Sequence, residues 1–141
     1  MDPISAVGFA ASILTFVDFS WSLVKGSHEI YRSMTGASTD HAQISTVLDN
    51  LEGVTNALQF EVKPTSPHRI ALKELAKGCA AVSQELSSIL EDLKRKEGNK
   101  VWRSLEAQWK VMRKEKTVAS IEQRLGSFRL DLLLRLNLII R

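Results

Sequence analysis

The 141-residue chain has one cysteine, three prolines, seven glycines and a single tyrosine. With Cys79 alone, an intramolecular disulfide framework is excluded, and a reducing compartment is indicated. So few prolines and glycines, beside 44% apolar and 25% charged residues, exclude a disordered or low-complexity chain. The sequence therefore predicts one globular domain over residues 1–141, with room for one hydrophobic core.

Motifs of catalysis and of cofactor binding are also absent. The sequence contains no Gly-rich phosphate loop, no GxSxG and no HExxH. His28, His41 and His68 lie far apart, and none has metal-ligand spacing with Cys79. Cys79 lies in an apolar helical stripe, where we expect a buried structural thiol rather than a nucleophile. We therefore expect a protein that is not an enzyme and that binds no cofactor and no metal.

Charge is nearly absent from the first 24 residues. After Asp2, only Asp18 interrupts the uncharged sequence before Lys25. A helix that is apolar on nearly all sides must be buried in protein or in lipid. The uncharged run over residues 3–17 is shorter than the roughly 20 residues of a membrane span, and Asp18 at mid-bilayer would cost about 2.5–3.5 kcal/mol. The segment therefore suits a protein core and is a borderline membrane span.

Three sets of residues on this N-terminal segment are functional candidates. The side chains that would enter a membrane are Ile4, Val7, Phe9, Ile13, Leu14, Phe16 and Val17. Gly8 and Ser12 have the small-xxx-small spacing that lets helix backbones approach closely in membranes, and they equally suit a neighbouring helix in a soluble bundle. We expect Asp18 to be partly buried, to pair with a Lys or Arg of another helix, and to act as a latch in the resting state.

Four to five helices, and no strand, are expected along the chain. The first runs over Pro3–Met34, is capped by Asp2, bends near Gly26 and is ended by Gly36. The second runs from Ser38 or Thr39 through Leu58. The third is capped by Ser66, begins with Pro67 and has the apolar stripe Leu72, Leu75, Cys79, Val82, Leu86, Ile89 and Leu93. The fourth covers Val101–Met112, and the fifth follows Thr117 and runs from Val118 through Leu136. Gly98 and Asn99 are expected to end the third helix, and Asn99 to cap the fourth. Since short connections imply antiparallel neighbours, the sequence predicts an all-α, up-and-down bundle of four to five helices with a hydrophobic N-terminal helix.

Positive charge gathers between residues 94 and 116. The nine basic residues there are Lys94, Arg95, Lys96, Lys100, Arg103, Lys110, Arg113, Lys114 and Lys116. Such a patch suggests an anionic partner, either lipid headgroups or nucleic acid. Anionic lipid is the better candidate, because the sequence has no helix-turn-helix signature. The same charges equally suit a helix face exposed to water. Trp102 and Trp109 could face a membrane surface, but we favour core anchors.

The chain ends in an uninterrupted apolar stretch. Residues 132–141 are apolar almost to the last residue, whereas natural C-termini usually fray into polar residues. We therefore expect a domain excised from the N-terminus of a longer protein. The alternative is a native terminal helix docked in the bundle.

The opening residues carry a family resemblance. MDPISAVGFAASILTFVDF, followed by Leu23-Val24-Lys25 and Glu29-Ile30-Tyr31, resembles the start of the fungal HeLo-like domains. These are N-terminal domains of fungal NOD-like receptors, the STAND proteins with a central NACHT or NB-ARC nucleotide-binding module. The later segments look compatible with that family over nearly the whole chain.

The resemblance implies a helical bundle that acts as a cell-death effector. Such a domain would self-associate when its receptor is activated, move from the cytoplasm to the plasma membrane, and attack the membrane through the helix over residues 4–24. It also implies a nucleotide-binding domain further along the parent chain. The alternative is a homotypic protein-interaction or scaffold domain without membrane activity.

Overall fold

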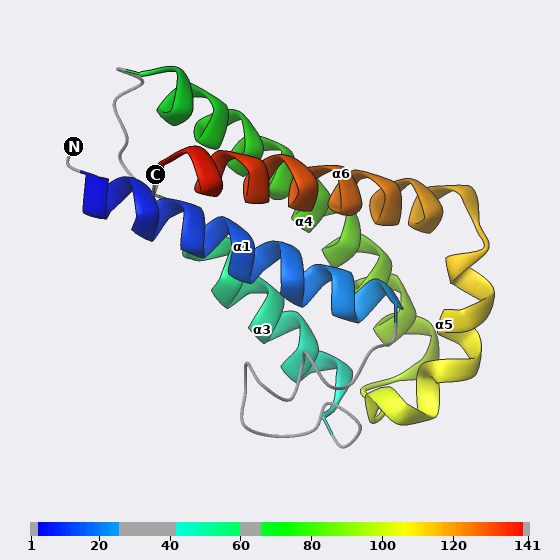
Figure 1. The fold of residues 1–141 in the computed structure, drawn as a ribbon. Helices are drawn as coiled ribbons and strands as arrows, with labels where there is room; N and C mark the ends of the chain where they lie inside the picture. Colours follow the sequence, from blue (N-terminus) through cyan, green and yellow to red (C-terminus); the bar gives the residue numbers. More distant parts are fainter. Residues whose placement is uncertain (1–2, 26–41, 60–65, 140–141) are drawn as a thin grey trace.

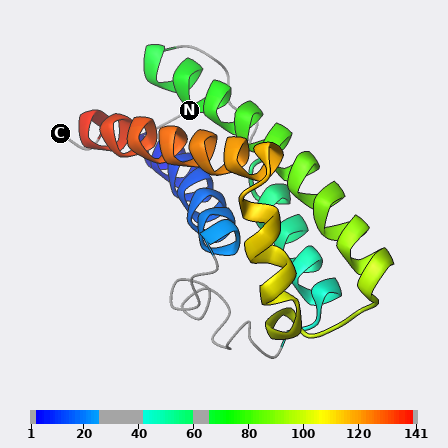
Figure 2. The ribbon, with the colours of Figure 1, turned by 90° about the vertical axis from the view of Figure 1, so that its right-hand side faces the viewer.

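A computed structural model describes residues 3–25, 42–59 and 66–139 of the protein (Figure 1). Its helical elements are α1 (Pro3–Lys25), α3 (Ile44–Asn56), α4 (Pro67–Glu97), the 3-10 turn η2 (Trp102–Leu105), α5 (Glu106–Arg113) and α6 (Lys116–Ile139). The four long helices run alternately in opposite directions, and α5 crosses one end of the bundle between α4 and α6 (Figures 1 and 2). The prediction of an all-α, up-and-down bundle with a hydrophobic N-terminal helix is confirmed.

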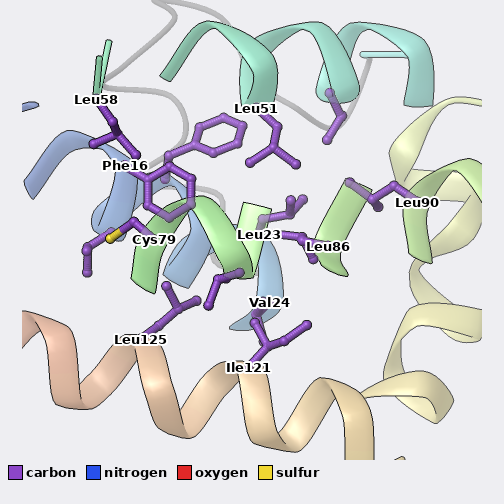
Figure 3. Close-up of a cluster of buried hydrophobic side chains, with 14 of the residues drawn as sticks. Phe16, Leu23, Val24, Leu51, Leu58, Cys79, Leu86, Leu90, Ile121 and Leu125 are labelled. Carbon is purple, nitrogen blue, oxygen red and sulfur yellow. The ribbon is translucent and has the colours of Figure 1, made fainter. Parts of the chain in front are cut away.

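Helix α1 contacts α3, α4 and α6, and α4 likewise contacts α1, α3 and α6. The core side chains that meet between these helices include Phe16, Leu23 and Val24 of α1, Leu51 of α3, Cys79, Leu86 and Leu90 of α4, and Ile121 and Leu125 of α6 (Figure 3). Each fully buried side chain of this kind contributes about 1.5–3 kcal/mol to folding. The apolar N-terminal segment is therefore part of the core that these helices share.

Helix α4 follows the local signals of its sequence. Ser66 is its N-cap, and the hydroxyl Oγ accepts a hydrogen bond from the backbone N–H of Arg69 at 3.3 Å. Gly98, with φ of +82°, ends the helix in a conformation that favours glycine. The buried stripe includes Leu90 rather than the predicted Ile89, which is only half-buried. A straight helix has 3.6 residues per turn, so it drifts from a strict 3-4 alternation by this point.

Helix α3 begins at Ile44, so the start predicted at Ser38 or Thr39, which lie outside the described residues, is wrong. Gln43 is extended, with φ of −72° and ψ of 156°, and forms an isolated antiparallel bridge with Val101. Two backbone hydrogen bonds flank it, from Trp102 N to Ala42 O at 2.7 Å and from Ile44 N to Lys100 O at 2.9 Å. Because this pairing uses the extended backbone of residues 42 and 43, the helix starts only after it.

Asn99 caps α3 rather than the fourth helix, for which it was predicted. Its side-chain oxygen Oδ1 accepts a hydrogen bond from the backbone N–H of Ser45 at 2.9 Å. The first N–H groups of a helix lack intrahelical partners, and Gln43 at the N-cap position makes no side-chain cap bond. A residue 54 positions along the chain therefore supplies the cap.

The remaining bounds differ modestly from the prediction. The bounds of α1 are Pro3–Lys25, and the cap at Asp2, the extension to Met34, the bend at Gly26 and the stop at Gly36 lie outside the described residues. Leu58 lies in a turn after α3 rather than inside it. The fourth segment begins with the 3-10 turn η2 before α5, and α6 starts one residue before Thr117.

Candidate functional site

Most of the predicted membrane-insertion residues of α1 face the core. Phe9, Ile13, Phe16 and Val17 are at most 2% exposed, whereas Val7 is 37% exposed and Leu14 is half-buried. The side chain of Ile4 lies outside the described residues. The 20-residue segment Ala6–Lys25 is long and apolar enough to cross a membrane by length and composition, a property that buried core helices share. In this structure, the bundle therefore buries most of the apolar surface of α1.

The small residues of α1 lie on its opposite side. No atom of another described segment lies within 4 Å of the place where a Cβ on Gly8 would stand. The Ser12 hydroxyl donates to the Gly8 carbonyl at 3.2 Å, and the Thr15 hydroxyl donates to the Ala11 carbonyl at 2.9 Å. Ala11 and Thr15 are exposed. Within the described part of the chain, this small-residue face is therefore not packed against a neighbouring helix.

Asp18 of α1 faces Arg129 of α6, which is the cation expected from another helix. The Asp18 side chain is 30% exposed, and its Oδ1 lies 3.9 Å from Arg129 Nε. This oxygen has no hydrogen-bond partner among the described residues. Burial raises the pKa of Asp18, and the positive charge of Arg129 offsets only part of that rise. The pair is therefore a weak attachment for α1.

The C-terminal end of α1 is held more firmly, by α5. Trp109 Nε1 donates a hydrogen bond to the carbonyl of Val24 at 3.1 Å, and Arg113 Nη1 donates to the carbonyl of Lys25 at 3.3 Å. The last carbonyls of a helix have no intrahelical partners, so these two side chains act as C-terminal caps. Figure 2 shows α5 beside this end of α1.

Glu122 of α6 completes these contacts, which we call the α1 clasp (Lys25, Trp109, Arg113 and Glu122). Lys25 Nζ lies 2.6 Å from Glu122 Oε1, and Arg113 Nη2 lies 3.5 Å from the same oxygen. The hydrogen bond from Lys25, aided by Arg113, holds the pKa of Glu122 below its ordinary range despite partial burial. The Lys25 ammonium also lies over the ring of Trp21 at 4.9 Å. One carboxylate thus joins α1, α5 and α6.

Trp102 and Trp109 are core anchors, as favoured from the sequence. They are 3% and 2% exposed, and their ring centroids lie 5.3 Å apart with planes tilted by 59°. Such a tilted arrangement is favourable for aromatic pairs. Neither ring is therefore presented to a membrane surface in this structure.

The basic residues of the 94–116 region divide into paired and unpaired groups. Arg95 pairs with Asp92 at 2.7 Å, Lys100 pairs with Glu97 at 3.2 Å, and Arg113 belongs to the α1 clasp. The exposed cations without an ion pair to another described residue are Lys96, Arg103, Lys110, Lys114 and Lys116. Free positive charge therefore concentrates around α5, at one end of the bundle (Figure 1).

Lys94 is the remaining cation of the region. It lines a polar groove of about 310 Å³ between α3 and α4, together with Asp49, Glu52 and Glu91. Because three carboxylates share this groove, Lys94 faces negative charge of its own chain and is a poor contact for an anionic ligand.

Cys79 is buried in the bundle core, as predicted. Its side chain is 0% exposed, and burial raises the pKa of the thiol to about 12. Nucleophilic cysteines require a thiolate near neutral pH, so Cys79 is a packing residue. Among the described residues, no group of three or more His, Cys, Asp or Glu side chains could hold a metal ion.

Comparisons of this chain with protein-family models, curated proteins and solved structures find no match. The resemblance of the opening residues to the HeLo-like domains stays a prediction from the sequence. Function is therefore inferred from the position of α1 and from the surfaces around it.

Proposed function

We propose that this domain is a non-enzymatic effector that acts on membranes through α1, as the resemblance to the N-terminal domains of fungal NOD-like receptors implies. The observation that carries the proposal is the position of α1. A helix of membrane-span length is packed in the core of the bundle, and polar contacts hold its C-terminal end. Such a helix can be kept in a water-soluble protein and released when contacts with lipid or with another protomer replace those of the bundle.

Energetics set what the released helix must do. Phe9, Ile13 and Phe16 leave water on folding, so α1 leaves the core only if lipid or another protomer takes up the same apolar surface. The ion pairs of the α1 clasp are partly exposed, with side-chain exposures between 22% and 40%. Pairs of that kind contribute little net free energy and exchange readily with water. Induced proximity of protomers at a membrane is the trigger that fits this balance.

The unpaired cations around α5 support a first contact with anionic lipid. Each cation near a negatively charged membrane surface contributes about 1 kcal/mol of attraction. Lys110 and Lys114 of this group are exposed beside Trp109 and Arg113, which contact α1. Binding of lipid at α5 would therefore act close to the contacts that restrain α1.

A second candidate function is a homotypic interaction domain without membrane activity. Four exposed leucines on α6 favour it, because a domain that acts only by inserting α1 has no need of them. The two functions differ in whether the protein permeabilises vesicles.

The test uses a charge that the folded bundle tolerates and the membrane does not. Thr15 is exposed on α1 and lies near the middle of the segment Ala6–Lys25. Thr15→Asp should leave folding intact but add about 2.5–3.5 kcal/mol to insertion, which is about a hundredfold loss of dye release from anionic vesicles. Thr46→Asp, an exposed threonine of α3, is the matched control and should release dye as the unmodified chain does.

Two outcomes would count against membrane insertion. A folded Thr15→Asp variant that releases dye at the original rate means that α1 does not cross the bilayer. No release and no co-sedimentation with vesicles by the unmodified chain favours the interaction domain. Circular dichroism of each variant shows whether the fold is retained.

A further inference from the structure

Helix α6 exposes a row of leucines along its C-terminal half. We call the set Leu130, Leu133, Leu134 and Leu138 the leucine face; these side chains are 73%, 46%, 59% and 43% exposed. Leu130, Leu134 and Leu138 follow one another at intervals of four, so they form a single ridge along the helix. Scattered exposed leucines are ordinary, but a contiguous row on one helix marks a contact surface.

The register between α1 and α6 extends this surface onto α1. Lys25 pairs with Glu122 and Asp18 pairs with Arg129, so the two helices run antiparallel, side by side (Figure 1). Continuing the same register places the half-buried Leu14 of α1 beside Leu133, with the exposed Val7 further toward the C-terminal end of α6. Along the contact between α1 and α6, ion pairs are therefore followed by apolar residues toward the C-terminal end of α6.

Charge is neutralised around the leucine face. Arg135 lies 3.6 Å from Asp131 on α6 itself, and Arg129 faces Asp18. Residues 3–17 of the neighbouring helix carry no charge. Among the described residues beside the leucine face, the charged side chains are therefore paired with each other, and an equally neutral apolar surface matches such a face.

We propose that the leucine face is the interface of a two-fold symmetric dimer, in which α6 packs antiparallel on α6 of a second copy about Leu134. The inference rests on the association of protomers that both candidate functions invoke, and not on the membrane step of the first. A two-fold interface uses the same patch on both subunits, so the patch must be compatible with itself. A neutral row of leucines meets that condition, because identical i, i+4 ridges pack into each other's grooves.

The exposed apolar area and the distribution of charge both suit a second copy of the chain as the partner. The exposed leucines present roughly 400 Å² of apolar surface, the size of the largest patch on a typical monomer, which is often functional. This is about half of the roughly 800 Å² per subunit in a standard interface. The rest would come from α1 and from polar side chains at the rim. An antiparallel arrangement also sends the basic α5 ends of the two copies in opposite directions, which avoids repulsion between them.

The first test is the mass of the purified chain in solution without lipid. Sedimentation equilibrium should give twice the 15.8 kDa of one chain. Leu134→Glu should weaken association by about a hundredfold or more, because each dimer would bury two facing carboxylates. Val111→Glu is the matched control, since Val111 of α5 is 65% exposed and lies outside the leucine face; this variant should remain a dimer.

The second test fixes the symmetry. Leu134→Cys should form an intermolecular disulfide rapidly under copper phenanthroline and air, because residue 134 of each copy lies near the axis. Ala81→Cys, exposed on α4, should cross-link slowly. The native thiol of Cys79 does not compete, because it is fully buried.

Several results would overturn the inference. They are a monomer at every concentration, a dimer that Leu134→Glu leaves intact, cross-linking of residue 134 no faster than that of residue 81, or a monomer that binds uncharged vesicles through the leucine face. Because these measurements need no membrane activity, a dimer that releases no dye would leave the inference standing while removing the proposed membrane step.

Discussion

Two carboxylates on the seam between α1 and α6 behave in opposite ways. Asp18 is partly buried with an ion pair at 3.9 Å and no hydrogen bond to Oδ1 among the described residues, so its pKa is raised. Glu122 Oε1 accepts a hydrogen bond from Lys25 Nζ at 2.6 Å, and this bond lowers the pKa of Glu122. Hydrogen-bond geometry, rather than the nearness of a cation, decides the sign of each shift. At neutral pH, Glu122 therefore stabilises the bundle and ionised Asp18 destabilises it.

Asp18→Asn should consequently raise the stability of the domain at pH 7, by less than about 1 kcal/mol because the side chain is partly solvated. Above the raised pKa, Asp18 is ionised in both the folded and the unfolded chain, and only the folded chain bears the desolvation cost. Below the ordinary value of 3.8, both states are protonated and the gain disappears. Urea unfolding of both proteins at pH 7 and at pH 3 measures the difference. A less stable variant at pH 7 would identify Asp18 as a true latch.

Single residues with local roles could be predicted from the sequence. Ser66 and Gly98 act at helix ends through their own backbone neighbourhood, and Cys79 follows from its place in an apolar stripe. The α1 clasp could not be predicted, because Trp109 and Arg113 reach carbonyl groups that lie 85 and 88 positions earlier in the chain. The only available signal was that a buried tryptophan N–H needs an acceptor, which does not say which one.

At the scale of elements, α1 is held by two kinds of contact of different strength. Its apolar side chains pack against α3, α4 and α6, and its last turn, which also buries Leu23 and Val24, makes the polar contacts of the α1 clasp. Polar contacts near the surface open more often than a packed core. The partly exposed ion pairs of Glu122 are therefore the contacts of α1 that open most readily, while Trp109, Leu23 and Val24 stay buried.

Glu122→Gln should loosen that turn selectively. The substitution removes the ion pairs to Lys25 and Arg113, and amide hydrogen exchange at the end of α1 should accelerate about threefold to tenfold. Glu85→Gln is the matched control, since it breaks the 2.7 Å pair with Arg124 between α4 and α6 without touching α1. Equal acceleration in the two variants would mean that the clasp has no special hold on α1. Below the lowered pKa of Glu122, the difference from the unmodified protein should vanish.

Helix existence could be predicted well, but helix starts less so. Apolar periodicity identified α3, α4 and α6, because burial on one face is what that period records. Helix α1, apolar on nearly all sides, was identified from its uncharged sequence and its first residues. The start of α3 was wrong because the backbone at residues 42 and 43 pairs with residues 100–102, and such a non-local pairing leaves no local pattern. The exposed leucines of α6 were assigned to no surface, since a sequence that is apolar on several faces does not say which face is covered.

For the whole molecule, the basic residues and the leucine face lie at opposite ends. Lys116 begins α6 and Leu134 lies 18 residues further along it, which is about 27 Å at 1.5 Å per residue. That distance exceeds the screening length of about 8 Å in physiological salt. Charges at α5 therefore neither assist nor oppose contacts made by the leucine face.

Binding to anionic vesicles and dimerisation should accordingly be independent. Lys110→Glu with Lys114→Glu should weaken binding to anionic vesicles by about thirtyfold or more, and the chain should remain a dimer. Leu134→Glu should abolish the dimer while each monomer keeps its intrinsic affinity for such vesicles. The triple variant should show each loss at the same size as the separate variants do, because the sites share no contacts. Vesicle co-sedimentation and sedimentation equilibrium measure the two properties separately. If the lysine substitutions also caused the dimer to dissociate, α5 would belong to the interface and the two-fold arrangement about Leu134 would be wrong.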